Sequence, residues 1–346
     1  MFAVIKNRVE LELKKFPENI DKTYHLRKIS PLLFKSIKDF ILRDGKRIRP
    51  ILFVAGYLGF SKKPAAGIYQ SALSIELLHD FMLIHDDIID KSAVRRGKPS
   101  MHKLFDAHIK HQKNIKFNGA DLAIVVGDVI YAIAIKAFLT VKEKPARKEL
   151  ALKKFIEAAL HTGAGEFIEL LTSLKDIQSV SKNDIYKIYD YKTACYTFST
   201  PLASGAILAG AKSQEADKLF QYGIYLGRAF QIKDDILGMF ASQAKIGKST
   251  LSDLQEAKKT LLVWQAYNFS GKKGKIVIKK MLKKNKVTGS DLLTMRQIIL
   301  ETGSLDYAQK EIFSMVEKSK KIIKSSSINK KYKNFLLEYP NRLLKI

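Results

Sequence analysis

The stretch Glu76–Gly97, ELLHDFMLIHDDIIDKSAVRRG, decides how this chain of 346 residues is expected to fold. Its first half carries apolar side chains at the spacing of one helical face: Leu77, Leu78, Phe81, Leu83 and Ile84. Such a stripe predicts a helix that is buried in a core. The same period recurs along nearly the whole chain, and no segment shows sustained alternation of apolar and polar residues. The sequence therefore predicts an all-α protein.

Acidic and then basic residues follow this apolar stripe. Asp86 and Asp90 lie one helical turn apart and Asp87 flanks them, so their like charges repel unless a cation joins them. Oxygen ligands suit Mg²⁺, which is often completed by substrate phosphates. The adjacent guanidinium groups of Arg95 and Arg96 suit diphosphate oxygens. An isolated aspartate cluster is usually only a solvated helix end, but the arginine pair favours a Mg²⁺–diphosphate site.

A second aspartate pair supports the prediction of a metal site. The segment Phe230–Gly238, FQIKDDILG, contains Asp234 and Asp235 in a similar apolar helical setting. Two apolar helices that each end in an aspartate pair are expected to face each other across a cavity. Carboxylates on both sides would then hold the metal ions.

Composition narrows the class of protein. The net charge of +27 invites a nucleic-acid or membrane interpretation, but the lysines are dispersed rather than aligned with base-stacking aromatics. Cys195 is the single cysteine, which excludes a disulfide framework and fits a reducing cytoplasm. The first residues lack the apolar core of a signal peptide, and the apolar run Leu122–Ile135 is too short to cross a bilayer. We expect a cytoplasmic protein with at most peripheral membrane contact and no nucleic-acid partner.

These motifs occur in an order that resembles the trans-isoprenyl (polyprenyl) diphosphate synthases, in particular the short-chain geranylgeranyl and farnesyl diphosphate synthases. That family carries DDxxD followed by RRG, then a lysine-threonine pair (here Lys192-Thr193), then FQxxDD, and matching segments run from about Lys46 to Thr260. The resemblance implies one polyprenyl synthase domain over residues 1–346. It implies a helical bundle around a deep central cavity, several Mg²⁺ ions per active site, and a homodimer.

The resemblance also implies a role for each matching residue. Isopentenyl diphosphate would be held by Lys46, Arg49, His79 and Arg96. The allylic diphosphate would be held by Arg95, Lys192, Lys248 and Lys258. Thr193 and Gln231 would contact substrate and take part in catalysis. The metal ions would be bound by Asp86, Asp87, Asp90, Asp234 and Asp235, of which Asp86, Asp87 and Asp234 count as catalytic together with Lys192.

Four positions depart from the family pattern. Glu166 and Glu169 replace the usual Gln and Asp, Gly238 replaces a third aspartate, and Ala257 replaces a glycine. Glu166 adds a negative charge near the site. Gly238 removes a possible ligand, and Ala257 alters the expected local turn.

The implied reaction is the head-to-tail condensation of isopentenyl diphosphate with an allylic diphosphate. Phe81 and Met82, five and four positions before Asp86, would form the floor of the product cavity. An aromatic residue only at the earlier position resembles the short-chain synthases that make geranylgeranyl diphosphate, with farnesyl or longer products as alternatives. Phe81 could equally be an ordinary core residue. A terpene cyclase, a non-catalytic regulatory subunit and a basic nucleic-acid-binding protein remain as rival interpretations.

Overall fold

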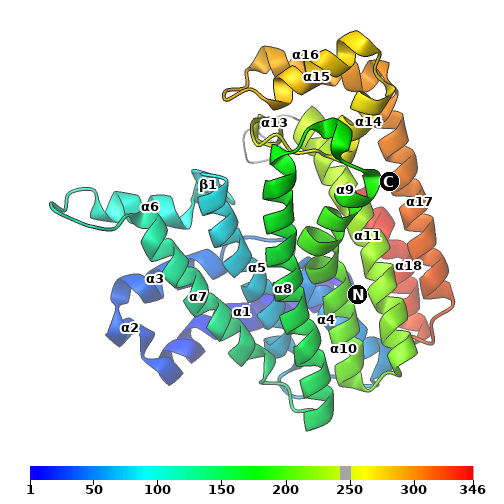
Figure 1. The fold of residues 1–346 in the computed structure, drawn as a ribbon. Coiled ribbons are helices and arrows are strands. Elements are labelled where there is room, and N and C mark those ends of the chain that lie inside the picture. Colours follow the sequence, from blue (N-terminus) through cyan, green and yellow to red (C-terminus); the bar gives the residue numbers. More distant parts are fainter. Residues whose placement is uncertain (242–250, 346) are drawn as a thin grey trace. The chain divides into compact units, whose positions relative to one another are not determined.

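The computed structural model describes residues 1–241 and 251–345, and nearly every element in these ranges is a helix (Figure 1). The all-α prediction is thus confirmed. The described residues form strands only in one small hairpin, where β1 (Val94–Arg95) pairs with β2 (Lys98–Pro99). Internal contacts divide the chain into two compact units, residues 1–152 with 204–211 and residues 153–203 with 212–346.

Helix α5 is the centre of the first unit and packs against five other helices. The helices of this unit are α1 (Phe2–Tyr24), α2 (Leu26–Ile29), α3 (Pro31–Ile41), α4 (Ile48–Phe60), α5 (Ile68–Ile89), α6 (Met101–Ile109) and α7 (Gly119–Phe138). Helix α8 (Pro145–Leu174) begins in the first unit, and α10 (Thr200–Ala209) ends in it. Almost every residue from the start of α5 to Leu78 is buried, because this helix is covered on several sides.

Local sequence signals set the starts of two helices around α5. The hydroxyl of Ser30 accepts a hydrogen bond from the Leu33 amide at 3.3 Å, and Pro31 occupies the first position of α3. Helix α7 begins with a capping box between Asn118 and Asp121. These caps fix where α3 and α7 begin.

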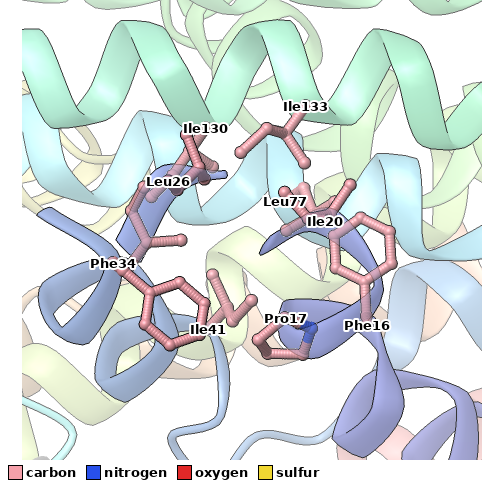
Figure 2. A pocket seen from close by; sticks show the side chains of 10 residues that line it. Phe16, Pro17, Ile20, Leu26, Phe34, Ile41, Leu77, Ile130 and Ile133 are labelled. Atoms are coloured by element: carbon pink, nitrogen blue, oxygen red, sulfur yellow. The ribbon is translucent and has the colours of Figure 1, made fainter. Parts of the chain in front are cut away.

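Apolar side chains from five helices converge on a small pocket in the first unit (Figure 2). The pocket is lined by Phe16, Pro17, Ile20, Leu26, Phe34, Ile37, Ile41, Leu77, Ile130 and Ile133. Leu77 contributes from α5, one turn before Phe81. The stripe that predicted a buried helix therefore does pack into a core.

Helix α11 holds the second unit together and packs against six of its elements. The elements that lie wholly in this unit are η1 (Ile177–Ser179), α9 (Lys182–Tyr189), η2 (Asp190–Ser199), α11 (Ser213–Phe240), α13 (Ser252–Gln255), α14 (Leu261–Phe269), α15 (Lys272–Leu282), α16 (Gly289–Glu301), α17 (Ser304–Lys324) and α18 (Lys330–Leu344). Element η2 is π-helical, a rare conformation often associated with functional sites.

Glycines allow α11 to approach η2 closely. A Cβ atom on Gly223 would lie 2.4 Å from Ser199 Cα, and one on Gly227 would lie 2.4 Å from Ala194 Cβ. Any larger residue at either position would push the two helices apart.

Within residues 1–241 and 251–345, no helix has both the length and the apolar character needed to traverse a lipid bilayer.

Candidate active site

The first aspartate cluster lies at the C-terminal end of α5. Asp86 and Asp87 are in its last turn, and Asp90 caps it by donating its amide to the Asp86 carbonyl at 2.8 Å. A helix C-terminus carries partial negative charge, so three carboxylates there are unfavourable without a cation. The end of α5 is therefore suited to attract positive charge.

The β1–β2 hairpin folds the arginine pair back onto α5. Arg96 and Gly97 form its two-residue turn with φ angles of 53° and 72°, as a type I′ hairpin turn requires. Arg95 Nε then donates to Asp87 Oδ1 at 2.8 Å, and Arg96 Nη1 donates to Asp80 Oδ1 at 3.3 Å. Both carboxylates are fully buried. The hairpin thus fixes the guanidinium groups beside the acidic end of α5.

A cluster of arginines surrounds His79. Burial lowers the pKa of its imidazole well below the usual value, and the positive charges of Arg49, Arg96, Arg95 and Arg47 lower the pKa further. His79 is therefore neutral at physiological pH. A neutral donor surrounded by guanidinium groups is suited to bind an anion such as a diphosphate.

The turn between α3 and α4 is anchored by Arg47. Its buried guanidinium donates to Glu76 Oε1 and Glu10 Oε1, both at 2.9 Å, and to the Arg43 carbonyl at 2.7 Å. A Cβ atom on Gly45 would come within 2.9 Å of Arg47 Nη1, so a larger residue there would displace the anchored guanidinium group. The anchored Arg47 fixes the positions of its neighbours Lys46 and Arg49.

Sequence reasoning missed this anchoring role. The available signal was a pair of acidic residues, Glu76 and Asp80, one turn apart inside an otherwise apolar helix. Buried charges need partners. Those partners are Arg47 for Glu76 and Arg96 for Asp80.

Phe81 does not stand alone at the position predicted to close the cavity. Its ring stacks on that of Tyr131 from α7, with 5.1 Å between centroids and 29° between planes. The His85 ring meets Phe81 edge-on at 4.5 Å and leaves no room for a Cβ on Gly127. Met82 is half-buried on the same helix. Phe81 and Tyr131 therefore form one aromatic layer across α5 and α7.

In the second unit, Lys192 lies between two carboxylates of α8. Its ammonium group forms ion pairs with Glu166 and Glu169, two of the four residues that depart from the family pattern. Burial alone would raise the pKa of Glu169, but Lys192 and Lys258 together hold it below its usual value. The backbone of η2 passes close to α8 at Gly165, where a Cβ atom would lie 2.6 Å from Lys192 N.

A chain of hydrogen bonds joins the predicted catalytic residues of this unit. Thr193 Oγ1 donates to Gln231 Oε1 at 2.7 Å, and Gln231 Nε2 donates to Asp235 Oδ1 at 2.9 Å. The Tyr189 hydroxyl donates to Asp235 Oδ2 and accepts from the Leu261 amide at 2.9 Å. Sequence reasoning missed Tyr189, because a tyrosine in a helical pattern is usually core.

The two aspartates of the second motif have different environments. Asp234 is exposed, whereas Asp235 is buried and both of its oxygens accept hydrogen bonds. Burial raises the pKa of Asp235 to about 7, against the effect of the hydrogen bonds from Tyr189 and Gln231. Asp234 is thus the more accessible carboxylate, and Asp235 is positioned to orient Gln231.

Two departures from the family pattern have clear structural consequences. A Cβ atom on Gly238 would lie 2.3 Å from Asp253 Oδ2, so the carboxylate of Asp253 occupies the space beside this position. Ala257 adopts the left-handed conformation with φ of 52°, which usually favours glycine. The next residue, Lys258, forms an ion pair with Glu256 at 2.7 Å.

Lys248, which was predicted to bind the allylic diphosphate, lies outside the described residues.

The donor chemistry of the first cluster fits a hard cation such as Mg²⁺. Asp87 Oδ2 is buried and has no hydrogen-bond partner among the described residues, so it is an orphaned negative oxygen. In the part of the chain that the structure describes, no group of three or more His, Cys, Asp or Glu side chains is arranged to hold a metal ion. Mg²⁺ ligation commonly combines one or two carboxylates with waters and substrate phosphates.

Comparison with known proteins points to one family. The family model described as Polyprenyl synthetase matches residues 30–299. A geranylfarnesyl diphosphate synthase of Aeropyrum pernix is 34% identical over 86% of this chain and 90% of its own. A geranylgeranyl diphosphate synthase of Saccharolobus solfataricus is 32% identical over 89% of this chain and 85% of its own.

The fold agrees with this assignment. A crystal structure of geranylgeranyl pyrophosphate synthase from Corynebacterium glutamicum, complexed with isoprenyl diphosphate and magnesium, superposes with a TM-score of 0.87. It is 25% identical, and the match covers 97% of both chains. The chain belongs to the polyprenyl synthetase family.

Proposed function

We propose that this protein is a Mg²⁺-dependent prenyltransferase that condenses isopentenyl diphosphate head-to-tail with an allylic diphosphate. The observation that carries the proposal is the arginine cluster around a neutral His79, next to the acidic end of α5. Anionic substrate and metal would meet where these two groups adjoin. The family relationship supports the same reaction.

Residues of the first unit would hold isopentenyl diphosphate. We assign this role to Lys46, Arg49, His79 and Arg96. Arg96 is held by Asp80, and the Lys46–Arg49 turn is held by Arg47. A site whose cations are fixed before binding loses less conformational entropy when the diphosphate arrives.

The allylic diphosphate would be bound by Arg95, Lys192, Lys258 and Lys248. When bound, Mg²⁺ ions would neutralise the charge that develops on the departing diphosphate. We assign their ligation to Asp86, Asp87 and Asp90 and to Asp234, and we assign Asp235 to the support of Gln231 and Thr193. The released diphosphate can accept the proton that is lost, so no protein base is required.

We propose geranylgeranyl diphosphate as the product. The stacked rings of Phe81 and Tyr131 form a layer that a growing prenyl chain would meet one turn before the aspartates. Met82 would flank this layer. Geranylfarnesyl diphosphate is the second candidate, because the relative from Aeropyrum pernix is described as a synthase of that product.

We further propose a homodimer located in the cytoplasm. Apolar residues at helical spacing form an exposed stripe along α8: Ile156, Leu160, Phe167, Leu170, Leu171 and Leu174. Contiguous apolar surface of this kind commonly marks a protein interface. The oligomer would be measured by light scattering coupled to gel filtration, and a monomer at assay concentration would refute it.

Incubation with Mg²⁺, labelled isopentenyl diphosphate and C5, C10 or C15 allylic diphosphates tests the proposal. A C20 product supports both the reaction and the role of Phe81. A product of another length keeps the reaction and overturns the assigned floor. No product from any primer, with folded protein and Mg²⁺ present, overturns the enzyme assignment and favours a regulatory subunit.

A further inference from the structure

Residues 257–290 form a strongly basic segment of the second unit. This segment contains ten lysines and no aspartate or glutamate. Some of these lysines serve the fold: Lys275 and Lys279 lie over the Tyr267 ring, and Lys284 pairs with Asp291 at 2.5 Å. Five other lysines, on α15 or in the four residues that follow it, are exposed: Lys272, Lys273, Lys280, Lys283 and Lys286.

Apolar side chains stand among these exposed lysines. Phe269 at the end of α14 and Ile276 on α15 are each 67% exposed, and Val277 is 37% exposed. Ile276 lies one turn after Lys272 and one turn before Lys280, so all three share a face of α15. The opposite face, with Ile278 and Met281, is buried against the unit.

We infer that this surface, defined by Phe269, Ile276, Val277 and the five exposed lysines, docks the protein onto a bilayer that contains anionic phospholipid. Lysines near an anionic leaflet are each worth roughly a fivefold increase in partitioning. Their aliphatic stems can lie along apolar surface while the ammonium groups reach headgroup phosphates. Phe269 and Ile276 would enter the boundary between headgroups and acyl chains.

The apolar residues favour a membrane over a nucleic acid. A duplex backbone offers phosphates to the lysines but no apolar phase for exposed aliphatic side chains. A bilayer interface offers both. The surface lies outside every residue assigned to substrate or metal, so vesicle binding and turnover are independent measurements.

The test uses full-length protein sedimented with vesicles of phosphatidylcholine alone or with added phosphatidylglycerol. Binding is expected only to the anionic vesicles and should weaken as salt is raised. A Lys272→Gln/Lys273→Gln/Lys280→Gln variant should partition roughly 100-fold less. Ile276→Ser should reduce partitioning roughly tenfold without changing net charge. Turnover of soluble substrates should stay unchanged in both variants.

Matched variants on the first unit serve as controls. Lys14→Gln/Lys15→Gln/Lys22→Gln removes the same charge from exposed positions of α1, and Leu11→Ser removes an exposed apolar side chain there. If these controls reduce binding as much as the α15 variants, net charge alone is responsible and the proposal fails. It also fails if duplex DNA outcompetes anionic vesicles for the wild type, or if Ile276→Ser binds as well as wild type.

Discussion

Replacing Tyr189 with phenylalanine tests whether the hydrogen-bond chain of the second unit is needed for catalysis. The Tyr189 hydroxyl is fully buried, and burial together with Asp235 raises its pKa well above the usual value, so it stays protonated and donates. It also accepts a hydrogen bond from the Leu261 amide, and this bond links the start of α14 to Asp235 through Tyr189. Phenylalanine keeps the ring and removes both interactions.

The expected cost follows from the number of groups left without a partner. A buried polar group that loses its hydrogen bond costs about 1–3 kcal/mol. Tyr189→Phe deprives an oxygen of Asp235 and the Leu261 amide of a partner, so the free energy of unfolding should fall by about 2–6 kcal/mol. Asp235 would then hold Gln231 less firmly, and Gln231 in turn would hold Thr193 less firmly. We expect kcat to fall about tenfold, which corresponds to about 1.4 kcal/mol.

Tyr222→Phe is the matched control. Tyr222 is also fully buried, and its hydroxyl donates only to the Leu336 carbonyl at 2.8 Å, away from the predicted catalytic residues. Its free energy of unfolding should fall by about 1–3 kcal/mol in urea denaturation, with unchanged kcat. Steady-state kinetics with varied Mg²⁺ then separates the two variants. Equal kcat for Tyr189→Phe and wild type would show that the chain only stabilises the fold.

Three further predictions concern single positions. Ala257→Gly should raise unfolding free energy by about 1 kcal/mol in urea denaturation, because glycine adopts the left-handed conformation without strain; no gain would mean that the turn is not strained. Burial raises the pKa of Asp80 from 3.8 to about 7, so the folded state binds the proton of this carboxyl more tightly than the unfolded state does. The stability gained from this proton binding is complete below about pH 4 and is lost as the pH rises through 7. Asp80→Asn should therefore flatten the decline of stability between pH 4 and 7, and an unchanged slope would contradict the raised pKa. Phe81→Ala and Tyr131→Ala should each lengthen the product in the primer assay, since each removes one ring of the stacked layer; an unchanged product from either variant would remove that residue from the floor.

Much of the fold could be predicted from periodicity alone. The apolar stripe of α5 and the cap formed by Ser30 and Pro31 both behave as their sequences indicate. These features depend on residues that are neighbours in the sequence, so a single chain is enough to recognise them. The hairpin of Arg95 and Arg96 was not predicted, because a two-residue strand is too short to show alternation.

The supporting residues of the site could not be predicted in the same way. Glu10, Arg47 and Glu76 meet through the tertiary fold, and nothing in their local sequence states which pairs form. Asp87 and Asp235 appeared equivalent to their neighbours in the motifs. Burial distinguishes them, because each is held by a donor from another element, Arg95 or Tyr189.

The arginines of the first unit suggest a reason why so many carboxylates surround the site that we propose for anions. Arg43, Arg47, Arg95 and Arg96 are each held by at least one carboxylate. A buried ion pair adds little net stability, because desolvation offsets much of the attraction. We propose that its benefit here is geometric, because guanidinium groups that are already fixed would bind a diphosphate without first losing rotamer freedom. Glu10 contributes to this order from α1, which precedes the segment matched by the family model, so the proposed anion site would depend on a helix beyond its recognisable motifs.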